Sequence, residues 1–345
     1  MSDHLRLDRE IASNMNDIPI IDLGAATGSS TIPASLLQAC ATWGFFYVRH
    51  HGIPQAEIDD CFQIVKDFFA QSEDVKNQAP YVPAQNAGFK PARSYSSANK
   101  EAGAQKSDPR ESFSMNKWVS KDAAASTPLP LGLAEHRETL LAFQRRCWGL
   151  ANIILEQIAQ SLELPQGYFL SQHHQDQANF DNFEIMHYPK PELNEVSSHR
   201  ISPHTDWGSI TCLFQQKIGG LQVRPPRYTS PQPSPDEEWF DAPVLDDCIL
   251  VNIGDMMEHW TAGKLRSTWH RVTSNTKYNR EHGVSDRWCM AYFLHPDKDS
   301  VLKPIQQLKQ EGYVSRYEGE GRTAAEHIAA RIGNAHNLTG VKMQA

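Results

Sequence analysis

Residues 204–215 read HTDWGSITCLFQ, a polar opening followed by a run of β-favouring side chains. Five more runs of this kind lie between residues 180 and 300, each short and bounded by turn-forming residues. Many short strands at such spacing are typical of a β-sandwich or a β-barrel, which we expect for this half of the sequence. The other runs are FEIMHYP (183–189), GGLQVRPP (219–226), CILVNIG (248–254), STWHRVTS (267–274) and RWCMAYFL (287–294).

The N-terminal half of the sequence shows mainly helical periodicity. DIPIIDLG (17–24) predicts an edge strand, and residues 32–54 predict an amphipathic helix followed by a strand. Apolar side chains at helical spacing predict two more helices, over residues 55–72 and 136–164. No internal repeat or clean linker separates these helices from the β-rich half, so we expect them to pack around one β core.

The sequence predicts a single domain over residues 17–345, preceded by a flexible polar tail over residues 1–16. Residues 73–108 are rich in Ala, Gln, Ser, Asn and Pro and predict a long loop, for which a functional lid and disorder both stay open. The domain divides into a helix and strand region over about 17–165, a β core over about 180–300, and a C-terminal helix over about 323–332 that opens with Thr-x-x-Glu and ends at Gly333.

The composition is that of an ordinary globular protein, with 40% hydrophobic and 21% charged residues. The sequence contains neither an apolar run of about 20 residues nor a signal-peptide core, so we expect a cytoplasmic protein without a membrane partner. Six cysteines without a Cys-x-x-Cys pair predict buried free thiols. The net charge of −8 argues against a nucleic-acid partner and leaves a small-molecule ligand open. Nothing in the sequence fixes an oligomeric state.

Two histidines and one aspartate form a candidate metal site. His204 and Asp206 are two residues apart, so alternation along a strand puts both on one face, and a neighbouring strand can bring in His270. Three ligands on one face leave three positions open, as iron(II) needs to bind an organic co-substrate and O₂ together. Two alternatives stay open: His270 could be a packed core histidine, and a zinc hydrolase could use the same three ligands to activate water.

The motifs quoted above, together with LVNIGD (250–255) and WGFFYVRHHGIP (43–54), resemble the isopenicillin N synthase-like group of iron(II)/2-oxoglutarate-dependent dioxygenases. The resemblance runs from about residue 17 to about residue 300, and the motifs come nearest to those of a fungal member. It implies an α+β, mainly β fold: a double-stranded β-helix, or jelly roll, flanked by helices. It also implies His204, Asp206 and His270 as the iron ligands, with no further catalytic residue.

The resemblance implies 2-oxoglutarate as co-substrate, with Arg287 and Tyr188 binding its far carboxylate. A guanidinium suits a carboxylate bidentately and stays charged when partly buried. Cys289 stands where the group usually has a serine and is a weaker hydrogen-bonding partner. Met186 stands where plant members often have asparagine. Because of these two departures, an oxidase that uses O₂ but no 2-oxoglutarate stays open.

The implied activity is oxidation of a C–H bond of a small-molecule metabolite, in fungal-type secondary metabolism. Hydroxylation is the default outcome, with desaturation, cyclisation or ring expansion as alternatives, and a non-catalytic binding module would be expected to lack a ligand. Glu184 and Met186 share a strand face with Tyr188, and we expect them, with Trp207, to face the substrate. A carboxylate at Glu184 must be neutralised, either by a cationic substrate group or by an internal lysine or arginine.

Overall fold

Two facing β-sheets form the centre of the computed structural model, which describes residues 17–26, 31–94, 108–116, 128–191, 199–309 except 229, 231, 235 and 275, residue 313, and residues 321–339. The larger sheet has eight strands, in the order Ile20–Asp22 (β1), Phe45–Arg49 (β2), Cys248–Ile253 (β10), Ile210–Gln215 (β7), Arg287–Leu294 (β12), Asn182–Tyr188 (β5), Glu111–Asn116 (β4) and Gly88–Lys90 (β3). The smaller sheet has four, in the order His199–His204 (β6), His270–Thr273 (β11), Leu221–Val223 (β8) and Phe240–Asp241 (β9). The predicted jelly-roll core is confirmed.

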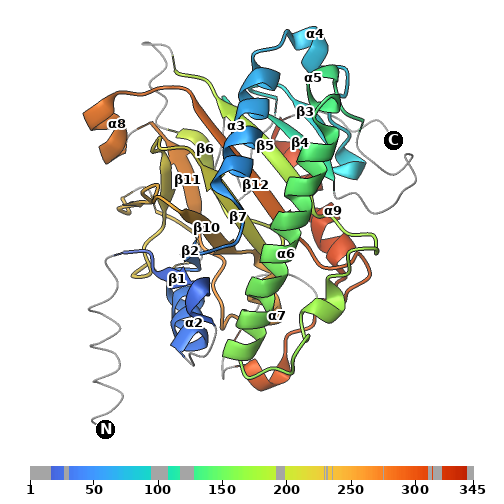
Figure 1. The fold of residues 1–345 in the computed structure, drawn as a ribbon. Coiled ribbons are helices and arrows are strands. Elements are labelled where there is room, and N and C mark those ends of the chain that lie inside the picture. The colour runs from blue at the N-terminus through green and yellow to red at the C-terminus, as the bar shows by residue number, and fades with distance from the viewer. Residues whose placement is uncertain are drawn as a thin grey trace.

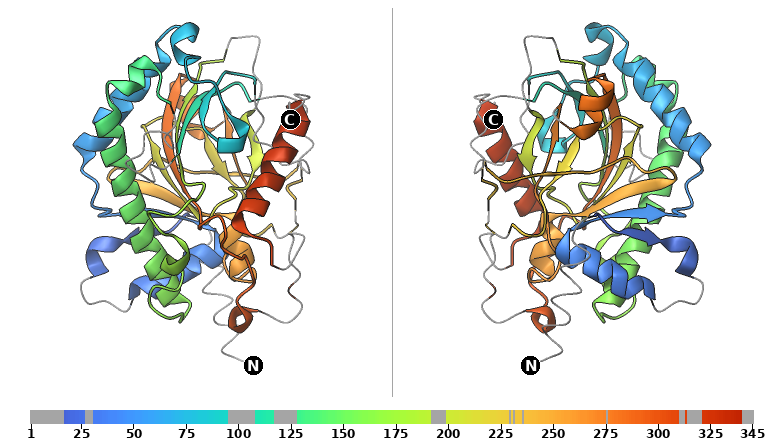
Figure 2. Two further views of the ribbon diagram at one scale, coloured as in Figure 1. Left: turned by 90° about the vertical axis from the view of Figure 1, so that its right-hand side faces the viewer. Right: turned by 90° about the vertical axis from the view of Figure 1, so that its left-hand side faces the viewer.

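Helices surround this core (Figure 1). Figure 2 shows α6 and the C-terminal helix α9 on opposite sides of the strands. The predicted helices over 55–72 and 136–164 are confirmed as α3 and α6. The helices are Thr31–Thr42 (α2), Gln55–Phe69 (α3), Glu73–Lys76 (α4), Leu131–Ala134 (α5), Arg137–Ser161 (α6), Asp255–Trp260 (α7), Lys277–His282 (α8) and Ala324–Thr339 (α9).

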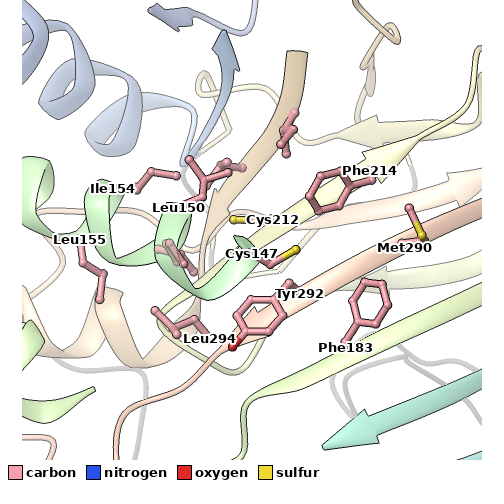
Figure 3. Packing of buried hydrophobic residues seen from close by; sticks show 14 of the residues in the cluster. Cys147, Leu150, Ile154, Leu155, Phe183, Cys212, Phe214, Met290, Tyr292 and Leu294 are labelled. Atoms are coloured by element: carbon pink, nitrogen blue, oxygen red, sulfur yellow. The ribbon is translucent and has the colours of Figure 1, made fainter. Parts of the chain in front are cut away.

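The central strands of the larger sheet are buried on both faces. On β12, Met290 and Tyr292 pack beneath α6, whereas Cys289 and Ala291 point into the space between the two sheets. This double burial explains why β12 is apolar from Trp288 onward and does not alternate between apolar and polar residues. Figure 3 shows the outer layer, where α6 packs on β7 and β12 through Cys147, Leu150, Ile154, Leu155, Phe214, Met290, Tyr292 and Leu294.

Two sequence expectations fail. Part of the predicted loop over 73–108 forms α4 and β3, and β3 pairs with β4 at the edge of the larger sheet. Three residues are too few to show periodicity, and Gly88 has a φ of 108°, a conformation in which a Cβ would lie 2.4 Å from the carbonyl oxygen of Pro80. The last helix starts with the predicted Thr323–Glu326 capping box but continues past Gly333, because a helical glycine costs only about 1 kcal/mol.

Other expectations concern β1, the cysteines and the membrane. The predicted edge strand near the N-terminus is confirmed as β1, which ends the larger sheet beside β2. All six cysteines are free thiols, as predicted. Among the described residues, no helix is both long enough and apolar enough to cross a membrane. The predicted tail over residues 1–16 lies outside the described residues.

Adjacent isoleucines on α6 test the packing of that helix. Ile154 is 1% exposed in the core and Ile153 is 53% exposed on the opposite side. We expect Ile154→Ala to lower the free energy of unfolding by about 2–5 kcal/mol, because it leaves a cavity, and Ile153→Ala to change it by less than about 0.5 kcal/mol. Urea denaturation measures both values, and equal effects would contradict the packing of α6 on the sheet.

Candidate metal centre

His204, Asp206 and His270 lie together at one end of the smaller sheet. His204 is the last residue of β6 and His270 the first of β11, and their Cα atoms are direct partners in this antiparallel pair. The Nε2 atoms of His270 and His204 lie 3.6 and 3.9 Å from Oδ1 of Asp206. Asp206 follows the end of β6, so the expectation that it shares a strand with His204 is wrong, although one ligand atom from each residue lies within 4.8 Å of the others.

Backbone carbonyls fix the orientation of both imidazoles. Nδ1 of His204 lies 2.9 Å from the carbonyl oxygen of Ser202, and Nδ1 of His270 lies 3.1 Å from that of Thr268. A carbonyl oxygen only accepts hydrogen bonds, so each ring carries its proton on Nδ1 and presents the lone pair of Nε2 to Asp206. This is the arrangement by which proteins orient histidine ligands toward a metal ion.

The carboxylate of Asp206 is fixed in the same way. Its Oδ2 accepts hydrogen bonds from the Thr211 hydroxyl at 2.6 Å and from the Asn252 amide at 2.7 Å, which leaves Oδ1 facing the histidines. The backbone N–H of Asp255 donates to the carbonyl oxygen of Asp206 at 2.8 Å. The carboxylate of Asp255 accepts from the Thr205 hydroxyl at 3.2 Å, so Asp255 holds both Thr205 and Asp206 in place. Sequence reasoning missed these supporting residues, although Asn252 and Asp255 lie in the quoted LVNIGD.

His204 and Asp206 favour the protonation states that bind a metal ion. Burial and the neighbouring His270 lower the pKa of His204 to about 3, so its imidazole is neutral at pH 7. Burial raises the pKa of Asp206, but His270, His204 and the two hydrogen bonds outweigh it and leave the pKa below its usual value. A neutral imidazole and an ionised carboxylate are ligand forms, so this donor set fits a divalent transition metal.

Arg287 and Tyr188, the residues expected to bind the co-substrate, lie between the sheets. They are Cα partners on β12 and β5, and the Arg287 side chain is fully buried. Its guanidinium donates to Gln215 Oε1 at 2.9 Å and to Cys289 Sγ at 3.3 Å, and its Nε has no partner among the described residues. A buried guanidinium held only by neutral groups is costly, so these residues suit an anion such as a carboxylate.

A cavity of about 90 Å³ adjoins the metal ligands, and two of the three predicted substrate residues line it. Trp207 and Glu184 line it, as expected. Met186 does not line it: its sulfur instead accepts a hydrogen bond from the Tyr188 hydroxyl at 3.5 Å. The remaining lining residues are Asn86, Lys90, Arg110, Asn182, His204, Thr205, Asp206, Phe293 and His295.

Glu184 is neutralised within the protein, by an internal lysine and arginine, which is one of the two alternatives that the sequence left open. Its Oε1 lies 3.1 Å from the Arg110 guanidinium and 3.4 Å from Nζ of Lys90. Burial raises the pKa of Glu184, but the charges of Lys90 and Arg110 outweigh it and lower the pKa to about 2. Both cations come from the region around β3 and β4, where the sequence showed no periodicity.

Comparison with known proteins places most of the chain in one group. A family model described as the 2OG-Fe(II) oxygenase superfamily matches residues 175–296, and one described as "non-haem dioxygenase in morphine synthesis N-terminal" matches residues 18–130. UPF0676 protein C1494.01 of Schizosaccharomyces pombe is 32% identical over 92% of both chains. Proline hydroxylase buaE of Petromyces alliaceus is 31% identical, over 86% of this chain and 91% of that protein.

Solved structures agree with these sequence matches. The structure of full-length thymine 7-hydroxylase from Neurospora crassa in complex with alpha-KG superposes with a TM-score of 0.74 at 25% identity, covering 92% of this chain and 96% of that one. Alpha-KG is 2-oxoglutarate. On these matches and on relatives above 30% identity over most of their length, the chain belongs to the 2OG-Fe(II) oxygenase superfamily, the dioxygenases that use iron(II), 2-oxoglutarate and O₂.

Proposed function

We propose that His204, Asp206 and His270 bind iron(II), and that this chain uses it to oxidise a C–H bond of a small molecule, by hydroxylation as the default outcome. The observation that carries the proposal is the convergence of two Nε2 lone pairs and one carboxylate oxygen, each fixed through its other polar atom. In the overall reaction, substrate, 2-oxoglutarate and O₂ give hydroxylated substrate, succinate and CO₂. The proposal includes a single catalytic domain over residues 17–345.

The bound iron would supply the activation of O₂ that is coupled to decarboxylation of 2-oxoglutarate. The residues of the chain bind and orient the reactants. Ligands from one side of the site leave the other side open to the reactants. Trp207 and Phe293 line the adjoining cavity with apolar surface, which holds the substrate and keeps water away from the reacting C–H bond.

Arg287 and Tyr188 would hold the far carboxylate of 2-oxoglutarate. Arg287 is buried without an ion-pair partner among the described residues, and the Tyr188 hydroxyl reaches the same space beside Cys289. The thiol at Cys289 donates only a weak hydrogen bond, so charge rather than a hydroxyl at that position would carry the binding. This charge favours a 2-oxoglutarate-dependent oxygenase over an oxidase that needs no co-substrate.

We further infer that the substrate is compact. The lining cations Lys90 and Arg110 are compensated within the protein, since both contact Glu184 and Nε of Arg110 also lies 4.0 Å from Oδ2 of Asp108. The cavity volume of about 90 Å³ favours a small molecule. The name of the relative from Petromyces alliaceus, a proline hydroxylase, is consistent with an amino-acid substrate.

The family, the free cysteines and the net charge support a proposal for the partners and the compartment of this protein. A small-molecule substrate is consistent with the oxygenase superfamily. The six free thiols support a reducing compartment, so we propose the cytoplasm as the site of action. The net charge of −8 supports the absence of a nucleic-acid partner, and we propose no membrane partner.

Substitution of the ligands tests the metal site. We expect His204→Ala, Asp206→Ala and His270→Ala each to abolish iron(II) retention and succinate formation, because each removes one of three ligand atoms. Iron content after anaerobic loading and dialysis, followed by a succinate assay, gives both values. His174→Ala is the control, since His174 is an exposed histidine paired with Asp297. Full iron content and turnover in any one ligand variant would show that the site lies elsewhere.

Arg287→Gln tests the co-substrate site. We expect the 2-oxoglutarate requirement to rise by roughly tenfold or more, because a hydrogen bond to a charged group contributes roughly 1.5–3 kcal/mol. Cys289→Ser should leave the requirement equal or lower it, since a hydroxyl donates more strongly than a thiol. Turnover is followed by O₂ consumption at varied 2-oxoglutarate. Substrate-dependent O₂ consumption without any 2-oxoglutarate would favour the oxidase alternative.

A further inference from the structure

Arg200 is a second buried arginine beside the proposed co-substrate site, and sequence reasoning missed it. It lies on β6, four residues before His204, in a stretch where the register between β6 and β11 shifts twice. Arg200 is 3% exposed. Its guanidinium donates to the carbonyl oxygens of Ser285 at 3.2 Å and Pro189 at 2.8 Å, and also to that of Tyr188.

These carbonyl partners hold the Arg200 side chain without neutralising its charge. No ion pair joins Arg200 to a carboxylate in the part of the chain that the structure describes. Asp286 acts on it electrostatically, but that carboxylate is engaged by His187 at 2.9 Å and by the backbone N–H of Lys190 at 3.2 Å. Burial and the neighbouring Arg287 lower the pKa of Arg200 to about 10, so it stays charged at pH 7.

Two buried guanidinium groups therefore approach the same tyrosine. The guanidinium carbon lies 5.5 Å from the centre of the Tyr188 ring for Arg200 and 4.8 Å for Arg287. Two like charges buried this close repel each other, and an anion between the sheets would relieve that repulsion. A dicarboxylate with one end at the metal would bring its other carboxylate to this position.

We propose that Arg200 is a positioning residue for 2-oxoglutarate: it fixes the Tyr188 end of β5 and adds a second positive charge that favours a far carboxylate. The inference rests on the proposed function, since it assumes a 2-oxo acid held at the metal. Because its described hydrogen bonds go to carbonyl oxygens, Arg200 acts through charge and through Tyr188 rather than by direct contact. This second charge offsets the weak hydrogen bonding of Cys289, the departure from the serine usual in the group.

Two 2-oxo acids separate this role from a merely structural one. 2-Oxoglutarate and 2-oxopentanoate have the same carbon chain, but 2-oxopentanoate lacks the far carboxylate. Their dissociation constants are measured on the iron(II)-loaded protein without O₂, from the visible absorbance of the chelate, in wild type, Arg200→Gln, Arg200→Lys and Arg287→Gln. Glutamine keeps N–H donors for the carbonyl oxygens but loses the charge, whereas lysine keeps the charge.

We expect Arg200→Gln to weaken 2-oxoglutarate binding by roughly tenfold and to leave 2-oxopentanoate unchanged, as a charge effect requires. Arg200→Lys should keep most of the preference for 2-oxoglutarate over 2-oxopentanoate. Arg287→Gln should lose this preference, as Arg200→Gln does. Equal weakening of both acids in Arg200→Gln, or no change in either, would overturn the proposal. If Arg200→Gln does not fold, Arg200→Lys tests the proposal instead, because loss of the preference for 2-oxoglutarate in that variant would also overturn it. Failure of wild type to bind either acid with iron(II) would instead refute the proposed function.

Discussion

The register between β6 and β11 is the constraint on which the site depends. It sets His204 directly opposite His270, at the end of one strand and the start of the next. Backbone carbonyls two residues before each histidine then orient the rings, so the same short strands that pair also fix the side chains. A one-residue slip would turn one histidine to the other face of the sheet. The larger sheet and its helices form the other side of the jelly roll and hold the pair of strands β6 and β11 in place.

Buried charge divides the interior into two functional regions. Between the sheets, Arg287 and Arg200 are held by neutral groups around Tyr188, which suits an anionic ligand. Beside the metal ligands, Glu184 neutralises charge from Lys90 and Arg110 within the protein itself. Burying a charge is costly unless an opposite charge compensates for it. The cluster around Glu184 is therefore stable without a ligand, whereas the two arginines favour binding of an anion.

The sequence predicted best where chemistry depends on residue type and strand spacing. His204, His270, Arg287 and Tyr188 come from strands long enough to recognise, and strand pairing sets His204 opposite His270 and Arg287 opposite Tyr188. The partners of Glu184 could not be predicted, since they come from β3, a strand of three residues, and from the residue before β4. Arg200 was missed for a different reason: β6 pairs with β11 through register shifts, so the sequence pattern showed neither where its side chain lies nor which carbonyl oxygens and charges it meets.

The edge position of β3 and β4 bears on how such an enzyme could change over time. These strands end the larger sheet, whereas the metal ligands come from the smaller sheet and the loop that follows β6. Residues at an edge contact fewer neighbours, so substitutions or insertions there disturb less of the core than changes in a central strand. Because the cations that line the substrate cavity come from this edge, substrate preference can diverge between relatives while the reaction chemistry stays fixed. In this chain, divergence of substrate preference and conservation of the metal ligands depend on different sheets.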